Sequence, residues 1–166
     1  LQRRLYRMFG TDGTDKLLFS ISAKNLSNGL FEQLEKFLCN NPDTSLIIID
    51  TLQKVREDLS ETCSYANDYE VASKLKSFSD KYGICFLLVH HTRKEKAEDI
   101  FAMISGTHGL FGAAAGAFVM YKEKRTAKTA TLAVSGRDQP DQKLFLMRNE
   151  ELLIWELDKV ETELWK

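Results

Sequence analysis

The strongest constraint on the fold is an apolar run over residues 46–49 that ends in a single carboxylate, Asp50. Four consecutive aliphatic residues, three of them β-branched, are typical of a strand buried on both faces of a parallel sheet. In open parallel sheets, ligands bind just outside the carboxyl ends of the strands. Asp50 is therefore expected at a sheet edge where it could hold a Mg²⁺ ion and a phosphate, although an aspartate that ends a strand is also common turn chemistry.

A second apolar run over residues 84–89 ends in two histidines, His90 and His91. Apolar residues at helical spacing between the two runs predict a helix that Gly83 ends. A strand, helix, strand unit is a right-handed crossover with parallel strands, so the histidines and Asp50 are expected on the same side of the sheet. Side chains alternate along a strand, so only one histidine can face the ligand crevice. Zinc is a competing interpretation, but adjacent histidines on a strand do not converge on one ion.

The remaining patterns predict a mixed α/β chain that forms one domain over residues 1–166. A parallel α/β part is expected over residues 1–116, with helices over 1–9, 30–38 and 99–104 and a short strand over 17–21. An antiparallel meander is expected over residues 117–157, with strands over 117–121, 129–135, 143–147 and 152–157. A terminal helix over residues 158–166 is expected to close the chain.

Composition excludes several classes of protein. With 43% hydrophobic and 28% charged residues, the chain is neither disordered nor membrane-like in composition. Its formal net charge of -1 argues against general electrostatic attraction to nucleic acid, so any such contact must be local. No apolar stretch reaches the roughly 20 residues that span a bilayer. Cys39, Cys63 and Cys85 lack metal-type spacing and suit free thiols, which favours a cytoplasmic location.

Two basic clusters are candidate contacts for nucleic acid, although acids interrupt both and a solvated surface is the simpler interpretation. The clusters consist of Arg93, Lys94 and Lys96, and of Lys122, Lys124, Arg125 and Lys128. Arg137, in the turn SGRD, is either an ordinary turn residue or a guanidinium that reaches a γ-phosphate across a subunit interface. Phe101, Phe111 and Phe118 are expected to pack in the core or an interface rather than to stack on bases.

Four segments, taken in order, resemble the carboxyl-terminal two thirds of a RecA-like ATPase. They are IIIDTLQKVRE, YANDYEVASKLKSFSDKYGICFLLVHHTRK, SGTHGLFGAAAG and SGRD. The closest resemblance is to the RepA-like replicative helicases of plasmids, phages and mobile elements, which are classed as AAA-family ATPases. It implies a RecA-like P-loop NTPase core with a carboxyl-terminal antiparallel meander. Asp50 then matches the Walker B aspartate next to Thr51, His90 or His91 matches the γ-phosphate sensor, and Arg137 matches the arginine finger.

The same resemblance implies partners and cofactors. ATP and Mg²⁺ are the expected cofactors of the full-length protein, which would self-associate into a ring, expected to be a hexamer. The segment over residues 92–115 would correspond to the central-channel loops that grip single-stranded DNA. Its expected contacts are Arg93, Lys94, Lys96, Ser105, Gly106, Thr107 and His108.

The chain departs from this family pattern in three places. No G-x-x-x-x-G-K-S/T motif occurs in it, the strand that ends in a water-polarising glutamate is missing, and Ala115 stands where related sequences tend to have an aspartate. We therefore expect a piece of an ATP-dependent DNA helicase, or of a related replication or mobilisation ATPase, that is inactive alone and binds no nucleotide. One alternative is a non-catalytic nucleic-acid-binding or oligomerisation module. Another is a metal-dependent hydrolase that uses Asp50 and one histidine.

Overall fold

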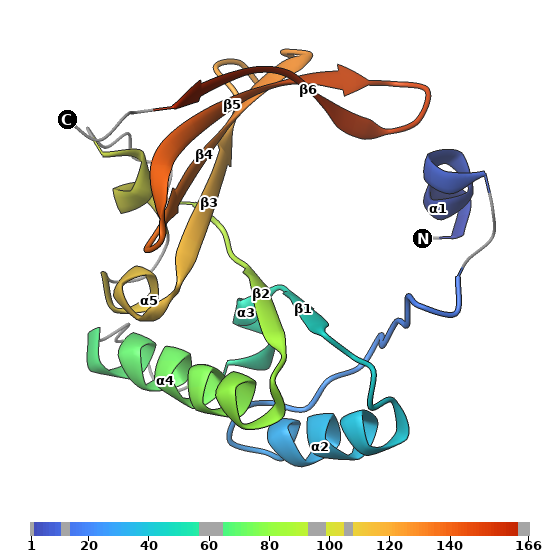
Figure 1. Cartoon of the computed structure of the whole chain (residues 1–166), viewed down its shortest axis with the longest axis vertical. Coiled ribbons are helices and arrows are strands. Elements are labelled where there is room, and N and C mark those ends of the chain that lie inside the picture. The colour runs from blue at the N-terminus through green and yellow to red at the C-terminus, as the bar shows by residue number, and fades with distance from the viewer. Residues whose placement is uncertain (1, 11–13, 57–64, 93–98, 105–107, 163–166) are drawn as a thin grey trace. The chain divides into compact units, whose positions relative to one another are not determined.

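The computed structural model describes residues 2–10, 14–56, 65–92, 99–104 and 108–162. These residues form two compact units. The parallel unit is Ile21–Ala114, and the antiparallel unit combines Leu1–Ser20 with Ala115–Lys166. Figure 1 shows the helices and strands of both units. The chain is mixed α/β, with a parallel sheet of two strands and a separate antiparallel sheet of four strands.

The parallel unit consists of two strands and the helices that surround them in sequence. Its elements are α2 (Leu30–Asn40), β1 (Leu46–Asp50), α3 (Leu52–Val55), α4 (Tyr65–Tyr82), β2 (Cys85–Val89), η1 (Ile100–Met103) and α5 (His108–Ala113). β1 and β2 pair in parallel, in register from Leu46 opposite Cys85 to Asp50 opposite Val89. The predicted parallel pairing across a helical crossover is confirmed. Gly83 follows α4 at φ 63°, a left-handed conformation that glycine adopts without steric penalty.

Helices cover one face of the β1–β2 sheet. Ile49 is buried and Ile47 packs against the same core, whereas Leu46 and Ile48 are 48% and 53% exposed. β2 repeats this alternation. The prediction that residues 46–49 form a strand buried on both faces is therefore wrong for the described residues. The reason is that the buried side chains of the helices gather on the side of Ile47 and Ile49, and no described element of this unit covers the other side.

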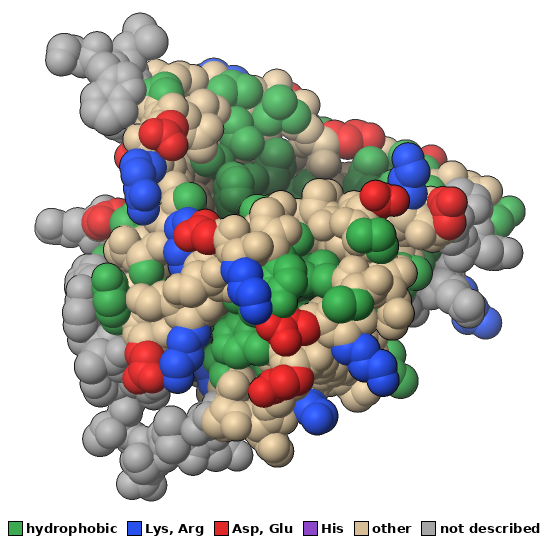
Figure 2. All heavy atoms as spheres, turned by 60° about the horizontal axis from the view of Figure 1, so that its bottom comes forward, with side chains coloured by type: hydrophobic (Ala, Val, Ile, Leu, Met, Phe, Trp, Pro, Cys, Tyr) green, Lys and Arg blue, Asp and Glu red, His purple; other side chains and the backbone are tan. Residues whose placement is uncertain are grey.

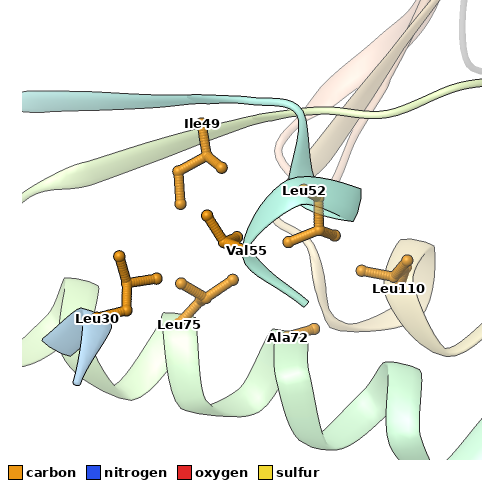
Figure 3. Close-up of a cluster of buried hydrophobic side chains, with 7 residues drawn as sticks. All are labelled: Leu30, Ile49, Leu52, Val55, Ala72, Leu75 and Leu110. Atoms are coloured by element: carbon orange, nitrogen blue, oxygen red, sulfur yellow. The ribbon is translucent and has the colours of Figure 1, made fainter. Parts of the chain in front are cut away.

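The buried core of the parallel unit joins β1 to four α-helices. Figure 3 shows its seven members, which are Leu30, Ile49, Leu52, Val55, Ala72, Leu75 and Leu110. They come from α2, β1, α3, α4 and α5. Leu52 is 1% exposed, and burying a leucine stabilises a fold by about 1.5 to 3 kcal/mol. Leu52 lies two residues after Asp50, so its burial fixes the position of the backbone that follows the carboxylate.

The antiparallel unit contains a four-stranded meander. Its elements are α1 (Gln2–Phe9), β3 (Gly116–Tyr121), β4 (Thr129–Gly136), β5 (Gln139–Asn149) and β6 (Ile154–Thr162). The strands neighbour one another in chain order and all pairs are antiparallel, so the predicted meander is confirmed.

The predicted terminal helix over residues 158–166 is wrong where the structure describes it, because residues 158–162 belong to β6. Leu157 and Val160 suggested a helix because they are three residues apart. In the structure, Leu157 lies opposite Leu146 and Val160 opposite Leu144, with a register shift between Phe145 and Leu146. The bulge adds one residue to β6, so two side chains three apart share one face of a strand. Residues 163–166 lie outside the described part.

The short strand predicted over residues 17–21 is also wrong. These residues adopt neither helix nor strand, and Leu18, Phe19 and Ile21 are exposed. The pattern LLFSI has the composition of a strand, but a strand requires a hydrogen-bonded neighbour, and no described strand pairs with these residues.

Gly116 allows β3 and β4 to approach closely at the start of the meander. A Cβ atom on Gly116 would lie 2.9 Å from the backbone carbonyl oxygen of Ser135. We therefore expect Gly116→Ala to lower the free energy of unfolding by about 1 to 3 kcal/mol, as overpacking does, in urea titrations followed by circular dichroism. Gly112→Ala is the matched control, because nothing lies within 4 Å of a Cβ there. Equal stability of the two variants would contradict this account of β3–β4 packing.

Candidate functional site

The positions of Asp50 and His90 are set by the register of the two parallel strands. Asp50 is the exposed last residue of β1 and lies opposite Val89, the last residue of β2, which His90 follows directly. Neighbouring strands are about 4.8 Å apart. The carboxylate and the imidazole therefore come from the same end of the same sheet, and the prediction that the two strand ends face the same side is confirmed.

The chain turns immediately after Asp50 into the short helix α3, where sequence analysis expected only a strand end. The Asp50–Thr51 peptide bond is cis. Thr51 is the N-cap residue of α3 with extended backbone, and its side chain makes no capping hydrogen bond. Leu52 and Val55 are buried, so the turn is anchored on the core side. Asp50 thus stands between a paired strand and a buried helix.

A buried ion pair involves the residue that directly follows α3. The Arg56 guanidinium donates to the Asp68 carboxylate, and the two side chains are 10% and 0% exposed. Arg56 follows α3, and Asp68 lies in the first turn of α4. Removing one member of a buried pair leaves an uncompensated charge, so the pair strongly favours this arrangement of α3 against α4 once it has formed.

His90 is half-buried, whereas His91 is exposed. Nδ1 of His90 lies 3.1 Å from the carbonyl oxygen of His91. A carbonyl oxygen only accepts, so Nδ1 carries the hydrogen, and Nε2 of the neutral ring has a free lone pair. Nε2 is buried and has no hydrogen-bond partner in the described part of the chain. A buried polar atom without a protein partner fits a group that a ligand would satisfy.

The surroundings of His90 disfavour its charged form. Burial lowers the pKa of His90 from its ordinary value of 6.5, the hydrogen bond to the His91 carbonyl opposes this shift, and the positive charges of Arg56 and His91 add to the lowering. At neutral pH the ring is therefore neutral. Nε2 can donate to an anionic oxygen only if an approaching negative charge first favours its protonation.

Two described segments that follow β2 pair with each other. Thr92 forms an isolated antiparallel bridge with Ile104, directly after η1. Asp99 caps η1 by accepting from the Phe101 N–H at 2.9 Å, which confirms the predicted helical turn. Phe101 stacks on Phe111 with centroids 5.5 Å apart, so the prediction that these rings pack is confirmed for this pair.

The expected DNA contacts fall largely outside the described residues. Those outside are Arg93, Lys94, Lys96, Ser105, Gly106 and Thr107. His108 is the first residue of α5, which packs against α4 through Leu110 and Ala72.

Arg137 belongs to the antiparallel unit, whereas Asp50, His90 and His91 belong to the parallel unit. It lies in the tight turn between β4 and β5, its side chain is exposed, and its N–H donates to the carbonyl oxygen of Ala115 at 3.0 Å. The turn prediction for SGRD is confirmed. The role of Arg137 as an arginine finger stays a prediction.

The described residues fit one half of a Mg²⁺-nucleotide site. No group of three or more His, Cys, Asp or Glu side chains among them converges as metal ligands. Mg²⁺ needs no such cluster, because it commonly binds through one or two carboxylates, water and the phosphates of its substrate. Asp50 is a suitable carboxylate and the free Nε2 of His90 a suitable neighbour.

A shallow apolar groove on α2 and α4 is a poor candidate for this chemistry. Phe31 and Phe78 form its floor, and Lys74 and Lys81 stand at its rim. Both lysines are paired with carboxylates, those of Glu70 and Glu35. Figure 2 shows apolar atoms between charges of both signs on the face formed by these helices. The groove has no convergent polar group that would orient a phosphate.

Sequence reasoning missed Arg56 and Asp68. A signal for Asp68 was present, because it precedes Ala72 and Leu75 by four and seven residues and so lies on the apolar stripe of α4. A charged residue on such a stripe needs a buried partner. Nothing in the pattern identified Arg56 as that partner.

Comparison with known families gives one match. A family model described as an AAA domain matches residues 1–97, which include Asp50, Thr51, His90 and His91 but not Arg137. Comparison with curated proteins gives no match. No helix among the described residues combines the length and the apolar character needed to cross a membrane.

Because the ion pair of Asp68 is buried, we expect substitution of this acid to destabilise the fold more than substitution of an exposed acid of α4. Asp68→Asn removes the counterion that the described part of the chain provides for the buried Arg56 charge, so we expect a loss of about 3 to 5 kcal/mol in the free energy of unfolding, measured by urea titration. Asp80→Asn is the matched control, because Asp80 pairs with Lys76 on the exposed side of the same helix. We expect only a small loss there. Similar losses for both variants would show that burial of the pair is unimportant.

The lowered pKa of His90 predicts a pH-dependent stability. The unfolded chain binds this proton at a higher pH than the folded chain, so the contribution is complete above 6.5 and is lost as pH falls through the folded value. We expect His90→Gln to flatten the rise of the unfolding free energy with pH in the range just below pH 6.5. An unchanged slope in His90→Gln would contradict the assignment.

Proposed function

The chain belongs to the AAA domain family, and we propose that it is the carboxyl-terminal part of an ATP-dependent DNA helicase or of a related DNA replication or mobilisation ATPase. The family match supports a general AAA-type, ATPase-related role. The observation that carries the finer proposal is the placement of Asp50 and His90 at the ends of two parallel strands in register. We also propose that the parallel unit is part of a RecA-like core.

In this proposal, Asp50 holds the metal side of the phosphate site. Bound Mg²⁺ neutralises charge on the transferred phosphoryl group. Asp50 would contact the ion directly or through its waters, and Thr51 would lie next to the nucleotide. The β1–β2 ladder fixes the backbone before the carboxylate, and the burial of Leu52 fixes it afterwards. A rigid carboxylate is what such a site requires, because positioning and electrostatics account for most of the catalysis of phosphoryl transfer.

His90 would sense the terminal phosphate. Its buried Nε2 has no hydrogen-bond partner among the described residues, and a phosphate charge beside it would offset the effects of burial and Arg56 that keep the ring neutral. Protonated Nε2 would then donate to the phosphate oxygen. Thr92, two residues later, pairs with Ile104, and three of the expected DNA contacts, Arg93, Lys94 and Lys96, lie between these two residues in sequence. His90 is therefore well placed to link the state of the nucleotide to these contacts.

The remaining parts of the proposal come from the family resemblance. Arg137 would act as an arginine finger on the nucleotide of a neighbouring subunit in a ring. Single-stranded DNA would be gripped by residues of the 92–115 segment. The rival proposal, a non-catalytic nucleic-acid-binding or oligomerisation module, is favoured by one observation: the sequence contains no phosphate-cradling G-x-x-x-x-G-K-S/T motif.

Hydrolysis of ATP by the intact protein tests the proposal. Asp50→Asn should reduce DNA-stimulated hydrolysis by at least about a hundredfold, since metal-ion catalysis supplies several kcal/mol. Arg137→Ala should reduce it about a thousandfold and leave nucleotide affinity nearly unchanged. Mixing the two variants should restore some hydrolysis if the finger acts between subunits.

Asp43→Asn is the matched control for Asp50→Asn, because Asp43 is an exposed acid seven residues earlier in the same unit. It should hydrolyse ATP like the parent. Full activity of Asp50→Asn would overturn the metal role of Asp50. If the intact protein neither binds nor hydrolyses Mg²⁺-ATP, the non-catalytic module is the better description.

A further inference from the structure

An indole ring in the antiparallel unit lies beside two cations. The Lys122 ammonium is 5.7 Å from the centroid of the Trp155 ring, and the Arg148 guanidinium carbon is 5.4 Å from it. Arg148 on β5 and Trp155 on β6 are paired in register, so both side chains lie on one face of the sheet. Lys122 follows β3 directly. Trp155 is half-buried.

More positive charge stands in the adjoining turn between β3 and β4. The turn is closed by the Ala127 N–H, which donates to the Lys124 carbonyl at 3.0 Å, and by the Lys122 ammonium, which donates to the Arg125 carbonyl at 2.9 Å. Lys124 and Arg125 are exposed, and neither pairs with a carboxylate in the described part of the chain. Their charges are therefore available to a ligand.

The acids near this cluster leave a local excess of positive charge. Glu150 accepts from Lys128 at 2.8 Å, and that hydrogen bond lowers the pKa of the Glu150 carboxyl. Glu156 accepts from Asn149 and lies opposite Met147, one position away in register from the Arg148–Trp155 pair and so on the other face of the sheet. Glu123 and Glu151 are exposed acids in the two adjoining turns. Among the described residues, Lys122, Lys124 and Arg125 form no ion pair with a carboxylate. Arg148 also forms none, although its positive charge contributes to the lowered pKa of Glu150.

We propose that this surface, the Trp155 cluster, binds single-stranded nucleic acid, with phosphates held by the four cations and a base stacked on Trp155. Surfaces that bind single strands combine a basic track with an aromatic ring, because every base has a π-face. The cations beside the ring add cation–π attraction. A duplex offers no free base face, and an anionic lipid or acidic peptide offers charge without a flat ring to stack.

The Trp155 cluster goes beyond the proposed ATPase function. It lies in the unit that does not contain Asp50 and His90, it shares no residue with the 92–115 segment, and its chemistry requires no nucleotide. Failure of ATP hydrolysis would therefore leave this inference untouched, and a failure of this inference would leave the phosphate site untouched.

Fluorescence anisotropy tests the proposal with a labelled oligonucleotide of about 20 thymidines and the full chain, without nucleotide. Lys124→Gln with Arg125→Gln should weaken binding about tenfold and reduce the salt slope of log K by about 1.4, since each phosphate contact contributes about 0.7. Both residues are exposed in a turn, so this variant should fold normally.

Trp155→Leu should weaken binding about tenfold, whereas Trp155→Phe, which keeps a π-face, should retain most of it. The oligonucleotide should quench the indole emission of the parent more than that of Trp155→Phe. Lys36→Gln with Lys76→Gln is the charge-matched control on the helices of the parallel unit, and it should bind like the parent.

Three outcomes would overturn the proposal. One is no binding of the thymidine oligonucleotide by the parent chain. Another is unchanged binding in both the Lys124/Arg125 double variant and Trp155→Leu. The third is tighter binding of a duplex of equal length, or of vesicles rich in phosphatidylserine, than of the single strand, which would assign the Trp155 cluster to a different partner.

Discussion

The parallel register of β1 and β2 is the constraint on which the candidate site depends. It sets Asp50 opposite Val89 and so brings a carboxylate and the imidazole of His90 to one end of the sheet, although 40 residues separate them in sequence. A slip of one residue would exchange the buried and exposed faces of a strand, moving Ile49 out of the core. The burial of Ile49 and Leu52 therefore stabilises the register and the site together. Packing in the core and chemistry at the edge are consequences of the same alignment.

Charge in the parallel unit is organised around one buried pair. Asp68 compensates Arg56 and ties α4 to the end of α3, and the remaining field of Arg56 still reaches His90, where it disfavours protonation. A structural ion pair thus also influences the protonation of a site residue. This gives the site a neutral imidazole whose affinity for a proton rises when an anion arrives.

The success of sequence reasoning depended on whether a feature is local. Strand ends at Asp50 and Val89 were predictable because each apolar run is short, is followed by polar residues and is separated from the other run by a helical pattern, and the meander was predictable from short alternating runs. A bulge near Asp158 defeated the periodicity argument, because one inserted residue gives strand residues a helical spacing. The pattern at residues 17–21 failed because pairing is a non-local property. The pairing of Arg56 with Asp68 could not be predicted, because it depends on the short helix α3, which no apolar pattern predicts.

The near-neutral charge of the chain also explains why its proposed contacts are small and specific. At physiological salt a charge is screened beyond about 8 Å, so scattered lysines that pair with glutamates, such as Lys74 and Lys81, attract a polyanion weakly. The cations around Trp155 differ because two of them, Lys122 and Arg148, lie within one Debye length of the same ring, and neither forms an ion pair with a carboxylate among the described residues. Such a cluster acts only on contact, and the ring gives that contact a preference for an unpaired base. In this way, a chain with no net positive charge can bind a single strand without binding polyanions non-specifically.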